Sequence, residues 1–268
     1  MNRFMKFLFN LSLILFLLLT ACTTKSAPSP ATAESPAKGH LVFKHTTVSL
    51  TFDDGSADNY SVREALAQNQ LHATFYIVSG FTGTNGFMTE EQLHNLYADG
   101  NEIGGHTLDH TKLWNLSSAD LKRQVCQDRL NLLALGFHVT SFAYPFGYYD
   151  EAAKQAVKEC GYNNARIVAD GPESIPPADP FALKAMPYIV PDTHLPKMIR
   201  YVTSVENNGG GWAIFIFHHV CDNCDKFAVA PQTFSDFADW LGTQQANGLV
   251  VKTVDEVVGG ATQPGVRP

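Results

Sequence analysis

The sequence predicts an α/β fold, either a parallel sheet or a (β/α) barrel, with about seven strands. Predicted strands and predicted helices alternate along the chain. The strands are short apolar segments, some with alternating polar and apolar residues, and the helices have the apolar spacing typical of helices. This order favours parallel strands, because each helix carries the chain back to the start of the next strand. One strand–helix unit of a (β/α) barrel takes about 31 residues. The 224 residues after position 44 are therefore enough for about seven such units. Its composition shows no break, which indicates one domain.

The predicted strands are short and apolar, and polar residues follow them. Segment 45–52 alternates and stops before Asp53, whereas 212–217 is apolar throughout and stops before His218. The remaining predicted strands are 73–78, 102–104, 142–144, 164–168 and 250–253.

The predicted helices carry residues typical of helix ends. Residues 89–99 have acidic side chains in the first turn and Gly100 after the last turn. Ser117 or Ser118 caps a longer helix that runs to Leu135. The remaining predicted helices are 57–68, 150–160, 195–207 and 234–245.

Residues 1–21 are predicted to be a lipoprotein signal peptide. Arg3 and Lys6 precede an apolar stretch over 7–19, which has the length of an export signal and is short for a membrane-spanning helix. The run Leu-Leu-Thr-Ala-Cys that ends at Cys22 resembles a bacterial lipoprotein processing box. An ordinary cleaved signal with an incidental cysteine is the alternative. We expect an exported protein, anchored to a bacterial membrane on the extracytoplasmic side by a lipid on Cys22.

Residues 22–44 are predicted to be the lipidated cysteine and a flexible tether, because they are rich in Pro, Ser and Ala. The domain is expected over 45–260, with a C-terminal tail over 261–268. The net charge is -7 and there is no basic cluster, which argues against a nucleic-acid partner. No protein partner is evident.

Four of the five cysteines remain in the domain once Cys22 is set aside. An even number outside the cytosol is compatible with two disulfides, which could pair in three ways. We favour Cys126–Cys160 and Cys221–Cys224. A redox-active Cys221–Cys224 pair is the alternative, although this pair follows a strand and does not begin a helix.

Polar residues with catalytic chemistry follow four predicted strands, and the carboxyl ends of strands converge on one site in α/β folds. Adjacent carboxylates repel each other, and a bound cation would offset this repulsion. A solvated Asp-Asp-Gly turn is the alternative. The residues at these strand ends are Asp53 and Asp54, His106 and His110, Pro145 to Gly147, and His218 and His219.

The spacing of His106 and His110 predicts that both imidazoles lie on one face of a helical turn, within reach of one ion. Two unrelated surface histidines are the alternative. Two histidines and one carboxylate leave coordination positions open for water and substrate, as a catalytic metal requires. Zn²⁺ is the favoured divalent metal, and Co²⁺, Ni²⁺ or Mn²⁺ would also fit.

These segments resemble the motifs of polysaccharide deacetylases, the NodB-homology fold or carbohydrate esterase family 4. They read Thr-Phe-Asp-Asp-Gly at 51–55, Gly-Gly-His-Thr-Leu-Asp-His at 104–110 and Phe-Ala-Tyr-Pro-Phe-Gly at 142–147. The apolar strand that ends at His218 resembles the final motif. The resemblance extends over about residues 45–257 and implies a distorted (β/α) barrel with about seven strands.

The resemblance also implies an activity and a role for each site residue. It implies a hydrolase that removes N-acetyl groups from an acetylated polysaccharide. Asp53 would be the general base and His218 the general acid, for which the neighbouring His219 is the alternative. The metal would be bound by Asp54, His106 and His110.

The third motif departs from the family pattern at two positions. The family often has Arg where this chain has Ala143, and Tyr where it has Phe146. The backbone N–H of Phe146, which follows Pro145, would still bind the oxyanion, but the base would lack its arginine partner. There is also no clear Asp-Trp fourth motif. Asp170 is a candidate for a supporting role near the site, with exposure in a loop as the alternative.

The leading hypothesis is N-deacetylation of an N-acetylglucosamine-containing cell-envelope or extracellular polysaccharide. An O-acetyl esterase acting on a xylan-type polysaccharide is one alternative. A carbohydrate-binding lipoprotein with a degenerate site is another. Trp114, Tyr148 and Tyr149 follow the site motifs, and they could stack on sugar rings or pack in the core or at the rim.

Overall fold

The computed structural model describes residues 41–268. The predicted signal peptide over 1–21, Cys22 and most of the predicted tether over 22–44 therefore lie outside the described residues. None of the helices in residues 41–268 has the length and apolar character that a membrane span requires.

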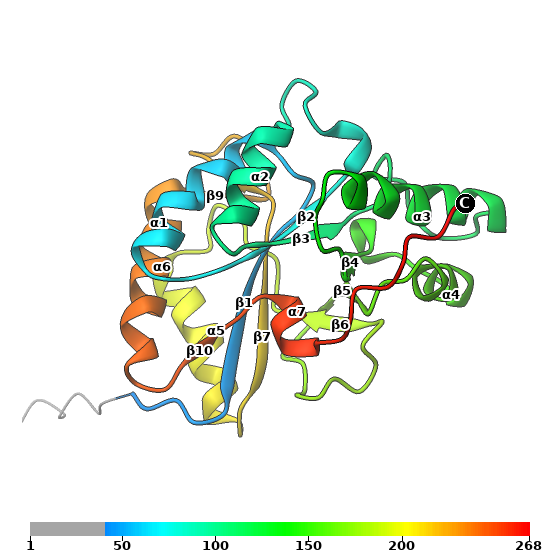
Figure 1. Ribbon diagram of the computed structural model, residues 1–268. Coiled ribbons are helices and arrows are strands. Elements are labelled where there is room, and N and C mark those ends of the chain that lie inside the picture. The colour runs from blue at the N-terminus through cyan, green and yellow to red at the C-terminus, as the bar shows by residue number, and fades with distance from the viewer. Residues whose placement is uncertain (1–40) are drawn as a thin grey trace, which may run out of the picture. The chain divides into compact units, whose positions relative to one another are not determined.

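A parallel sheet curls into an incomplete barrel at the centre of the molecule (Figure 1). Its path runs β7-β1-β2-β3-β4-β5-β6 and every pairing on it is parallel, which confirms the predicted distorted barrel of about seven strands. The strands are β1 (Thr46–Phe52), β2 (Thr74–Ile77), β3 (Glu102–Gly105), β4 (Ser141–Ala143), β5 (Asn164–Asp170), β6 (Leu183–Ala185), β7 (Gly211–Phe217) and β10 (Val250–Val251).

Strand β1 organises this sheet because it is paired on both sides. On one side β7 follows it along its whole length, from Thr46 opposite Gly211 to Phe52 opposite Phe217. On the other side β2 pairs with its C-terminal end and the short β10 with its N-terminal half. The residues that follow β1 and β7 must therefore lie side by side at the carboxyl edge of the sheet.

The helices cover the outside of the curled sheet, with α1, α5 and α6 on one side of β1 and β7, and α3 and α4 at the other end of the sheet (Figure 1). The predicted Ser117 cap is present, since its hydroxyl accepts from the Asp120 N–H. Thr89, which was predicted as the first helical residue, instead caps its helix and forms a capping box with Gln92. The helices are α1 (Arg63–Gln68), α2 (Glu90–Ala98), α3 (Ser118–Ala134), α4 (Glu151–Glu159), α5 (Leu195–Asn207), α6 (Pro231–Gln245) and α7 (Val254–Val258).

The sequence analysis predicted the short strands β4 and β10 but missed four other short elements. Strand β6 and helix α7 were missed, as were β8 (His219–Val220) and β9 (Ala228–Val229), which pair with each other. Each of these elements has five residues or fewer, which is too short to show a period of 2 or 3.6.

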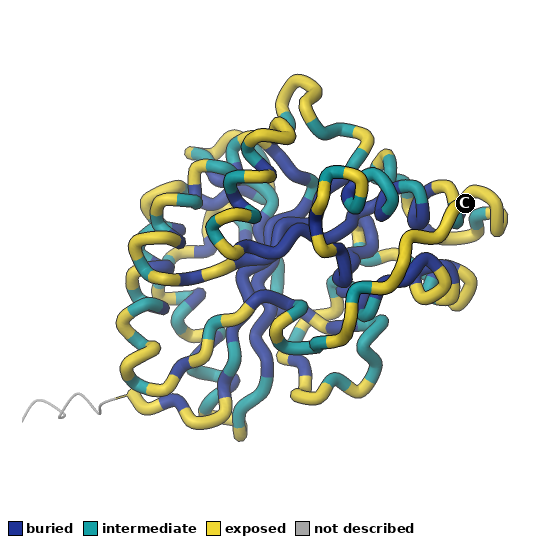
Figure 2. The backbone as a smooth tube through the Cα atoms, in the orientation of Figure 1, coloured by how far each residue is buried: buried dark blue, intermediate teal, exposed yellow. Residues whose placement is uncertain are grey.

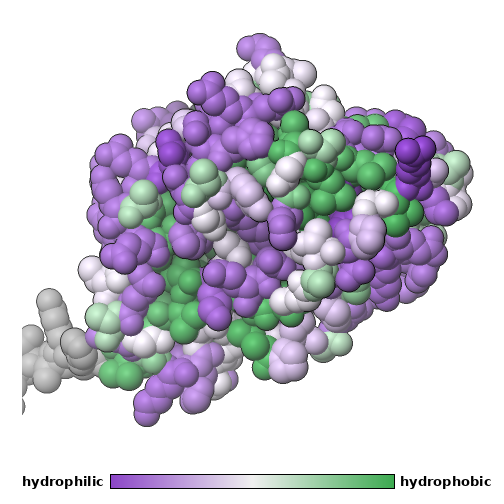
Figure 3. Space-filling view, viewed as in Figure 1, coloured by the Kyte–Doolittle hydropathy of each residue, from purple (hydrophilic) through white to green (hydrophobic). Residues whose placement is uncertain are grey.

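The core has two parts, one inside the curled sheet and one between the sheet and its helices. The central strands are the most continuously buried part of the backbone (Figure 2). Trp212 fills the inside, where its indole N–H donates to the Ser49 hydroxyl at 2.9 Å. Outside, the Phe52 ring stacks between Phe75 and Phe217 at centroid distances of 4.9 and 5.1 Å. Figure 3 shows a largely hydrophilic face on which the hydrophobic patches are separated by polar side chains.

Two disulfides are present within residues 41–268, and both are the favoured pairs. Cys126–Cys160 joins α3 to the end of α4. Cys221–Cys224 closes a short loop directly after β8.

A buried carboxyl at the amino end of β3 makes the stability of the fold depend on pH. One oxygen of Glu102 accepts from the Thr74 hydroxyl at 2.7 Å and from the Asp255 N–H at 3.0 Å. Burial raises the pKa of Glu102 from 4.5 to about 7. The folded state therefore holds this proton more tightly than the unfolded state does. Its contribution to stability is complete below pH 4.5 and is lost as the pH rises to about 7.

We expect Glu102→Gln to be more stable than the wild type at pH 8, by up to about 3 kcal/mol, because the amide stays neutral. Urea unfolding at pH 4.5 and pH 8 measures this, and the difference between the two proteins should largely vanish at the lower pH. The exposed Glu91→Gln is the matched control. Equal pH slopes for Glu102→Gln and the wild type would contradict the prediction.

Candidate active site

Asp53 and His218 lie next to each other because the strands before them are paired in register. Phe52 lies opposite Phe217, and the Asp53 backbone N–H donates to the Phe217 carbonyl at 2.9 Å. Nε2 of His218 lies 3.9 Å from Oδ2 of Asp53. The structure thus brings the predicted base and the predicted acid to one point at the carboxyl edge of the sheet.

His106 and His110 lie in a loop after β3, so the predicted helical turn is wrong. The backbone of Thr107 and His110 is left-handed, with φ values of 70° and 61°, a conformation that is rare for residues other than glycine. Two oxygens of Gln124, on α3, accept backbone N–H groups of this loop at 3.0 and 3.3 Å. The bent loop, and not the pitch of a helix, aims both imidazoles at the same place.

The structure brings together the three residues predicted to bind a metal, which are Asp54, His106 and His110. Oδ1 of Asp54 lies 3.4 Å from Nε2 of His106 and 3.1 Å from Nε2 of His110. Nδ1 of His106 lies 2.7 Å from the Ala143 carbonyl, which can only accept, so Nδ1 carries the proton and Nε2 keeps its lone pair. Burial raises the pKa of Asp54, but the two imidazoles outweigh burial and hold this pKa well below its usual range.

This arrangement fits a divalent cation. Oδ1 of Asp54 is buried and accepts no hydrogen bond from the described residues. Such a buried oxygen is costly unless something compensates it. One anionic oxygen and two imidazole nitrogens, all within 4.8 Å of one another, would compensate this cost by binding one ion. They would leave coordination positions open, as catalytic sites do.

Arg166 supplies the arginine that the third motif lacks. It lies on β5 directly opposite Ala143 of β4, and it is completely buried. Its Nη2 donates to both carboxylate oxygens of Asp53, at 2.7 and 2.5 Å. The guanidinium therefore reaches the base from the neighbouring strand. The sequence analysis missed Arg166, for which the available signal was a charged residue inside a predicted strand.

Pro145 and Phe146 form a tight turn after β4. Phe146 has φ 57° and ψ 9°, which is left-handed and uncommon for a non-glycine residue. Its ring is half-exposed and lies 4.5 Å from the ring of His110. The turn therefore lies directly beside the ligand set, where the resemblance implies an oxyanion-binding N–H.

His218 and His219 point to different partners. His218 lies between Tyr188 and Phe227, at centroid distances of 5.8 and 5.1 Å. Burial lowers the pKa of His218, and its Nδ1 has no hydrogen-bond partner among residues 41–268. Nδ1 of His219 instead lies 2.7 Å from Oδ2 of Asp58. The geometry thus favours His218 over His219 as the acid.

Two further sequence expectations concern residues around this site. Asp170 is exposed at the end of β5 and makes no hydrogen bond to His218 in the described structure. Asp58, His219 and Cys224 also form a group with metal-ligand chemistry. Cys224 is disulfide-bonded and offers no thiolate, so this second group lacks a ligand.

Residues 42–165 match the model of the polysaccharide deacetylase family. Over this part of the chain, which is a little under half of its length, the protein is similar to polysaccharide deacetylases. YxkH of Bacillus subtilis, which is assigned to the same family, is 32% identical over 118 residues, or 43% of this chain and 42% of its own. A peptidoglycan-N-acetylglucosamine deacetylase of Bacillus cereus is 28% identical over 117 residues, or 43% of this chain and 53% of its own. The chain thus spans about half the length of these relatives.

Solved structures show the same fold. The family 4 acetyl xylan esterase of Clostridium thermocellum, determined with a cobalt ion, has a TM-score of 0.58 at 17% identity. The alignment covers 79% of this chain and 90% of that one. The Streptococcus pyogenes deacetylase PplD, determined with acetate, has a TM-score of 0.54 at 23% identity and covers 57% of this chain and 69% of its own.

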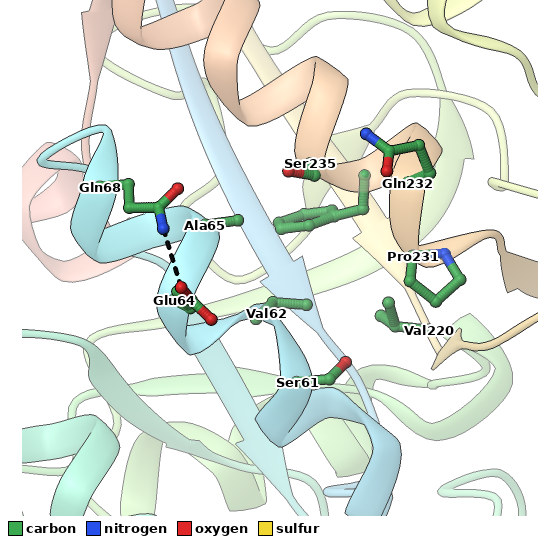
Figure 4. Close-up of a pocket in the computed structure, with 10 residues that line it drawn as sticks. Ser61, Val62, Glu64, Ala65, Gln68, Val220, Pro231, Gln232 and Ser235 are labelled. Atoms are coloured by element: carbon green, nitrogen blue, oxygen red, sulfur yellow. Dashed lines mark hydrogen bonds between the residues drawn. The ribbon is translucent and has the colours of Figure 1, made fainter.

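The candidate site residues line a cavity of about 360 Å³, and they are Asp53, Asp54, His106, His110, Phe146 and His218. Its walls include Tyr188 and Phe227, which the sequence analysis did not identify. A second cavity, of about 330 Å³, lies between α1 and α6 (Figure 4). Its one charged residue, Glu64, accepts a hydrogen bond from Gln68, so this second cavity holds no cluster of reactive groups.

Proposed function

We propose that this protein is a polysaccharide deacetylase, a metal-dependent hydrolase that removes N-acetyl groups from an N-acetylglucosamine-containing cell-envelope or extracellular polysaccharide. The main support is one observation: a carboxylate base held by a buried arginine lies beside a three-residue ligand set at one edge of the barrel. The likeness to the Bacillus cereus peptidoglycan-N-acetylglucosamine deacetylase supports the choice of substrate class.

The chain's own groups can carry each proton of the reaction. A divalent cation on the ligand set would polarise the acetyl carbonyl and acidify a water molecule. Asp53 accepts the proton of the attacking water. The Phe146 N–H donates to the carbonyl oxygen as it becomes negative. Protonated His218 gives its proton to the departing nitrogen, so the products are acetate and a free amine. Zn²⁺ is the proposed metal, with Co²⁺, Ni²⁺ and Mn²⁺ as alternatives.

Removal of O-acetyl groups is the second candidate function, and the environment of His218 is the observation that favours it. Its Nδ1 has no carboxylate partner among the described residues, and burial lowers its pKa. A histidine in this state is protonated in a smaller fraction of molecules at neutral pH, so fewer of them can act as the acid. An ester needs less protonation of its leaving group than an amide does, so an acetylated xylan belongs in the assay.

The structure weakens the hypothesis that the protein binds sugar with a degenerate catalytic site. That hypothesis depended on the substitutions at Ala143 and Phe146. Arg166 now occupies the position from which an arginine can hold the base. The Phe146 substitution leaves the backbone N–H in place, so neither change removes a required group.

Acetate release from a panel of acetylated glycans tests the proposal. The metal-loaded protein should release acetate from N-acetylglucosamine polymers, and chelator should abolish the release. Including a chitin oligomer and an acetylated xylan separates the two candidate functions. Unchanged activity after complete metal removal would refute the metal-dependent mechanism. Tight sugar binding without turnover at any metal loading would favour the sugar-binding alternative.

We further propose that the protein is exported and anchored by a lipid on Cys22. The charged and apolar segments within 1–21 and the processing-box resemblance support this, as do the disulfides. Metabolic labelling with a fatty acid should mark the wild type. Cys22→Ser should remain unlabelled and leave the membrane fraction. Equal labelling of both proteins would contradict a lipid on Cys22.

A further inference from the structure

Three exposed aromatic rings gather beside the candidate active site. Trp114, Phe146 and Tyr148 are 51%, 47% and 44% exposed, and they are the only aromatic members of the exposed large hydrophobic side chains in residues 41–268. The Trp114 and Tyr148 rings lie 5.7 Å apart. The Phe146 ring touches the ring of His110, at 4.5 Å between centroids. The rings therefore continue from the ligand set out to the surface.

Two loops hold this surface rigidly. Leu113 and Tyr149 form a parallel β-bridge, and the Asn115 N–H donates to Oδ2 of Asp150 at 3.0 Å. The other oxygen of Asp150 caps α4 by accepting from the Ala153 N–H at 2.8 Å. A partner that binds here would thus lose little free energy to ordering of the loops.

Tyr149 belongs to the packing beneath this surface and not to the surface itself. Its ring stacks on the buried Tyr144 at 4.8 Å. Of the three aromatic residues that the sequence left open between sugar stacking and packing, Tyr149 packs, whereas Trp114 and Tyr148 face solvent.

A lysine lies among the exposed rings. Nζ of Lys112 is 5.1 Å from the centroid of Phe146 and 4.9 Å from that of Tyr148. Cation–π attraction stabilises it there. An ammonium group offers three donors and no acceptor, so it can meet the hydroxyl oxygens of a ligand that lies on the rings.

We propose that Trp114, Tyr148 and Lys112 form a binding surface for the sugar ring next to the one that is deacetylated. This inference rests on the proposed function. A pyranose ring has one face of C–H groups, which suits the negative face of an aromatic ring, and hydroxyls at its edge, which suit Lys112. Exposed aromatic clusters on soluble proteins mark interaction sites. Because the cluster continues directly from the catalytic cavity, its occupant is the rest of the polymer.

Kinetics on N-acetylglucosamine oligomers of increasing length test the proposal. For the wild type, kcat/KM should rise with length once the flanking sugar is present. Trp114→Ala and Tyr148→Ala should each lower kcat/KM about tenfold on long oligomers. Neither substitution should change kcat/KM for the shortest oligomer that the wild type cleaves. Val266→Ala, which removes an exposed apolar side chain from the C-terminal segment, is the control. Wild-type length dependence in both aromatic variants would overturn the proposal.

A binding measurement separates this proposal from the catalytic one. Asp54→Ala should be retained by the insoluble polymer, and Asp54→Ala/Trp114→Ala should be retained about tenfold more weakly. This readout needs no turnover, so it stands even if the wild type releases no acetate, a result that would refute the proposed function alone. Equal retention of the two proteins would overturn the binding surface. Binding of the same two proteins to lipid vesicles is measured alongside. If Asp54→Ala bound vesicles and the added Trp114→Ala weakened vesicle binding as much as polymer binding, the rings would be assigned to a membrane instead.

Discussion

Arg166→Ala should lower kcat/KM for acetate release by about 10–100-fold, although Arg166 touches neither substrate nor metal ligands. The reason is that Nη2 of Arg166 holds both oxygens of Asp53. Loss of a group that orients a catalytic side chain through hydrogen bonds typically costs about 10–100-fold in activity. Without the guanidinium, Asp53 is a buried carboxylate that has lost its arginine partner. Breaking one side of a buried ion pair costs about 3–5 kcal/mol of stability.

The same pairing of strands suggests a rescue. Ala143 and Arg166 are register partners on β4 and β5, so their side chains point to the same face of the sheet. Arg166→Ala/Ala143→Arg would move the guanidinium to the position where the family often has it. We expect the double variant to recover part of the lost kcat/KM and of the lost stability.

A second buried arginine provides the control for general damage. Arg129 donates to the backbone carbonyls of Val139, Cys160 and Gln263 and lies outside the catalytic cavity. Arg129→Ala should lose stability but keep the kcat of its folded fraction. A shift in the pH profile of kcat should appear in Arg166→Ala alone. Wild-type kcat/KM in folded Arg166→Ala would show that Asp53 needs no arginine, and would remove the positioning role.

The sequence predicted most of the sheet because its strands are apolar and end at polar residues. The strand ending before His218 was predicted as 212–217 and is found at Gly211–Phe217. The helix 195–207 was predicted with its observed bounds. Capping residues and glycines made such boundaries visible. β6 has only three residues and depends on pairing with β5, so local sequence carries little information about it.

Arg166 shows what local sequence cannot provide. Its role depends on β5 lying next to β4 in a register that places it beside Ala143. A charged side chain between Ala165 and Ile167, in a predicted strand, was the visible anomaly. The strand prediction did not show that this buried arginine takes the place of the one missing at Ala143, because it did not show which strands are neighbours. The loop of His106 and His110 was misjudged for a similar reason. Its left-handed residues, Thr107 and His110, flank two residues whose backbone N–H groups donate to Gln124 of α3, a contact that the local spacing does not show.

Substitution of a single residue of the ligand set should abolish stoichiometric metal binding together with activity. Asp54→Ala removes the one anionic ligand atom, which lies 3.1 and 3.4 Å from the two imidazole nitrogens. We expect kcat/KM to fall by at least about 10³-fold, since the group that polarises the carbonyl is lost. Calorimetric titration with Zn²⁺ should show one site per chain in the wild type and none of comparable affinity in the variant.

His219→Gln is the matched control, because this imidazole adjoins the cavity but pairs with Asp58 and lies outside the ligand set. It should retain one Zn²⁺ per chain. His106→Gln should bind as poorly as Asp54→Ala, because both remove a member of one set. The two readouts must move together: if Asp54→Ala lost activity while its zinc affinity stayed at the wild-type value, Asp54 would act in the chemistry and not as a ligand. If His219→Gln lost the metal instead, the cation would belong to the neighbouring Asp58–His219 pair, and the mechanism built on Asp53 would have to be abandoned.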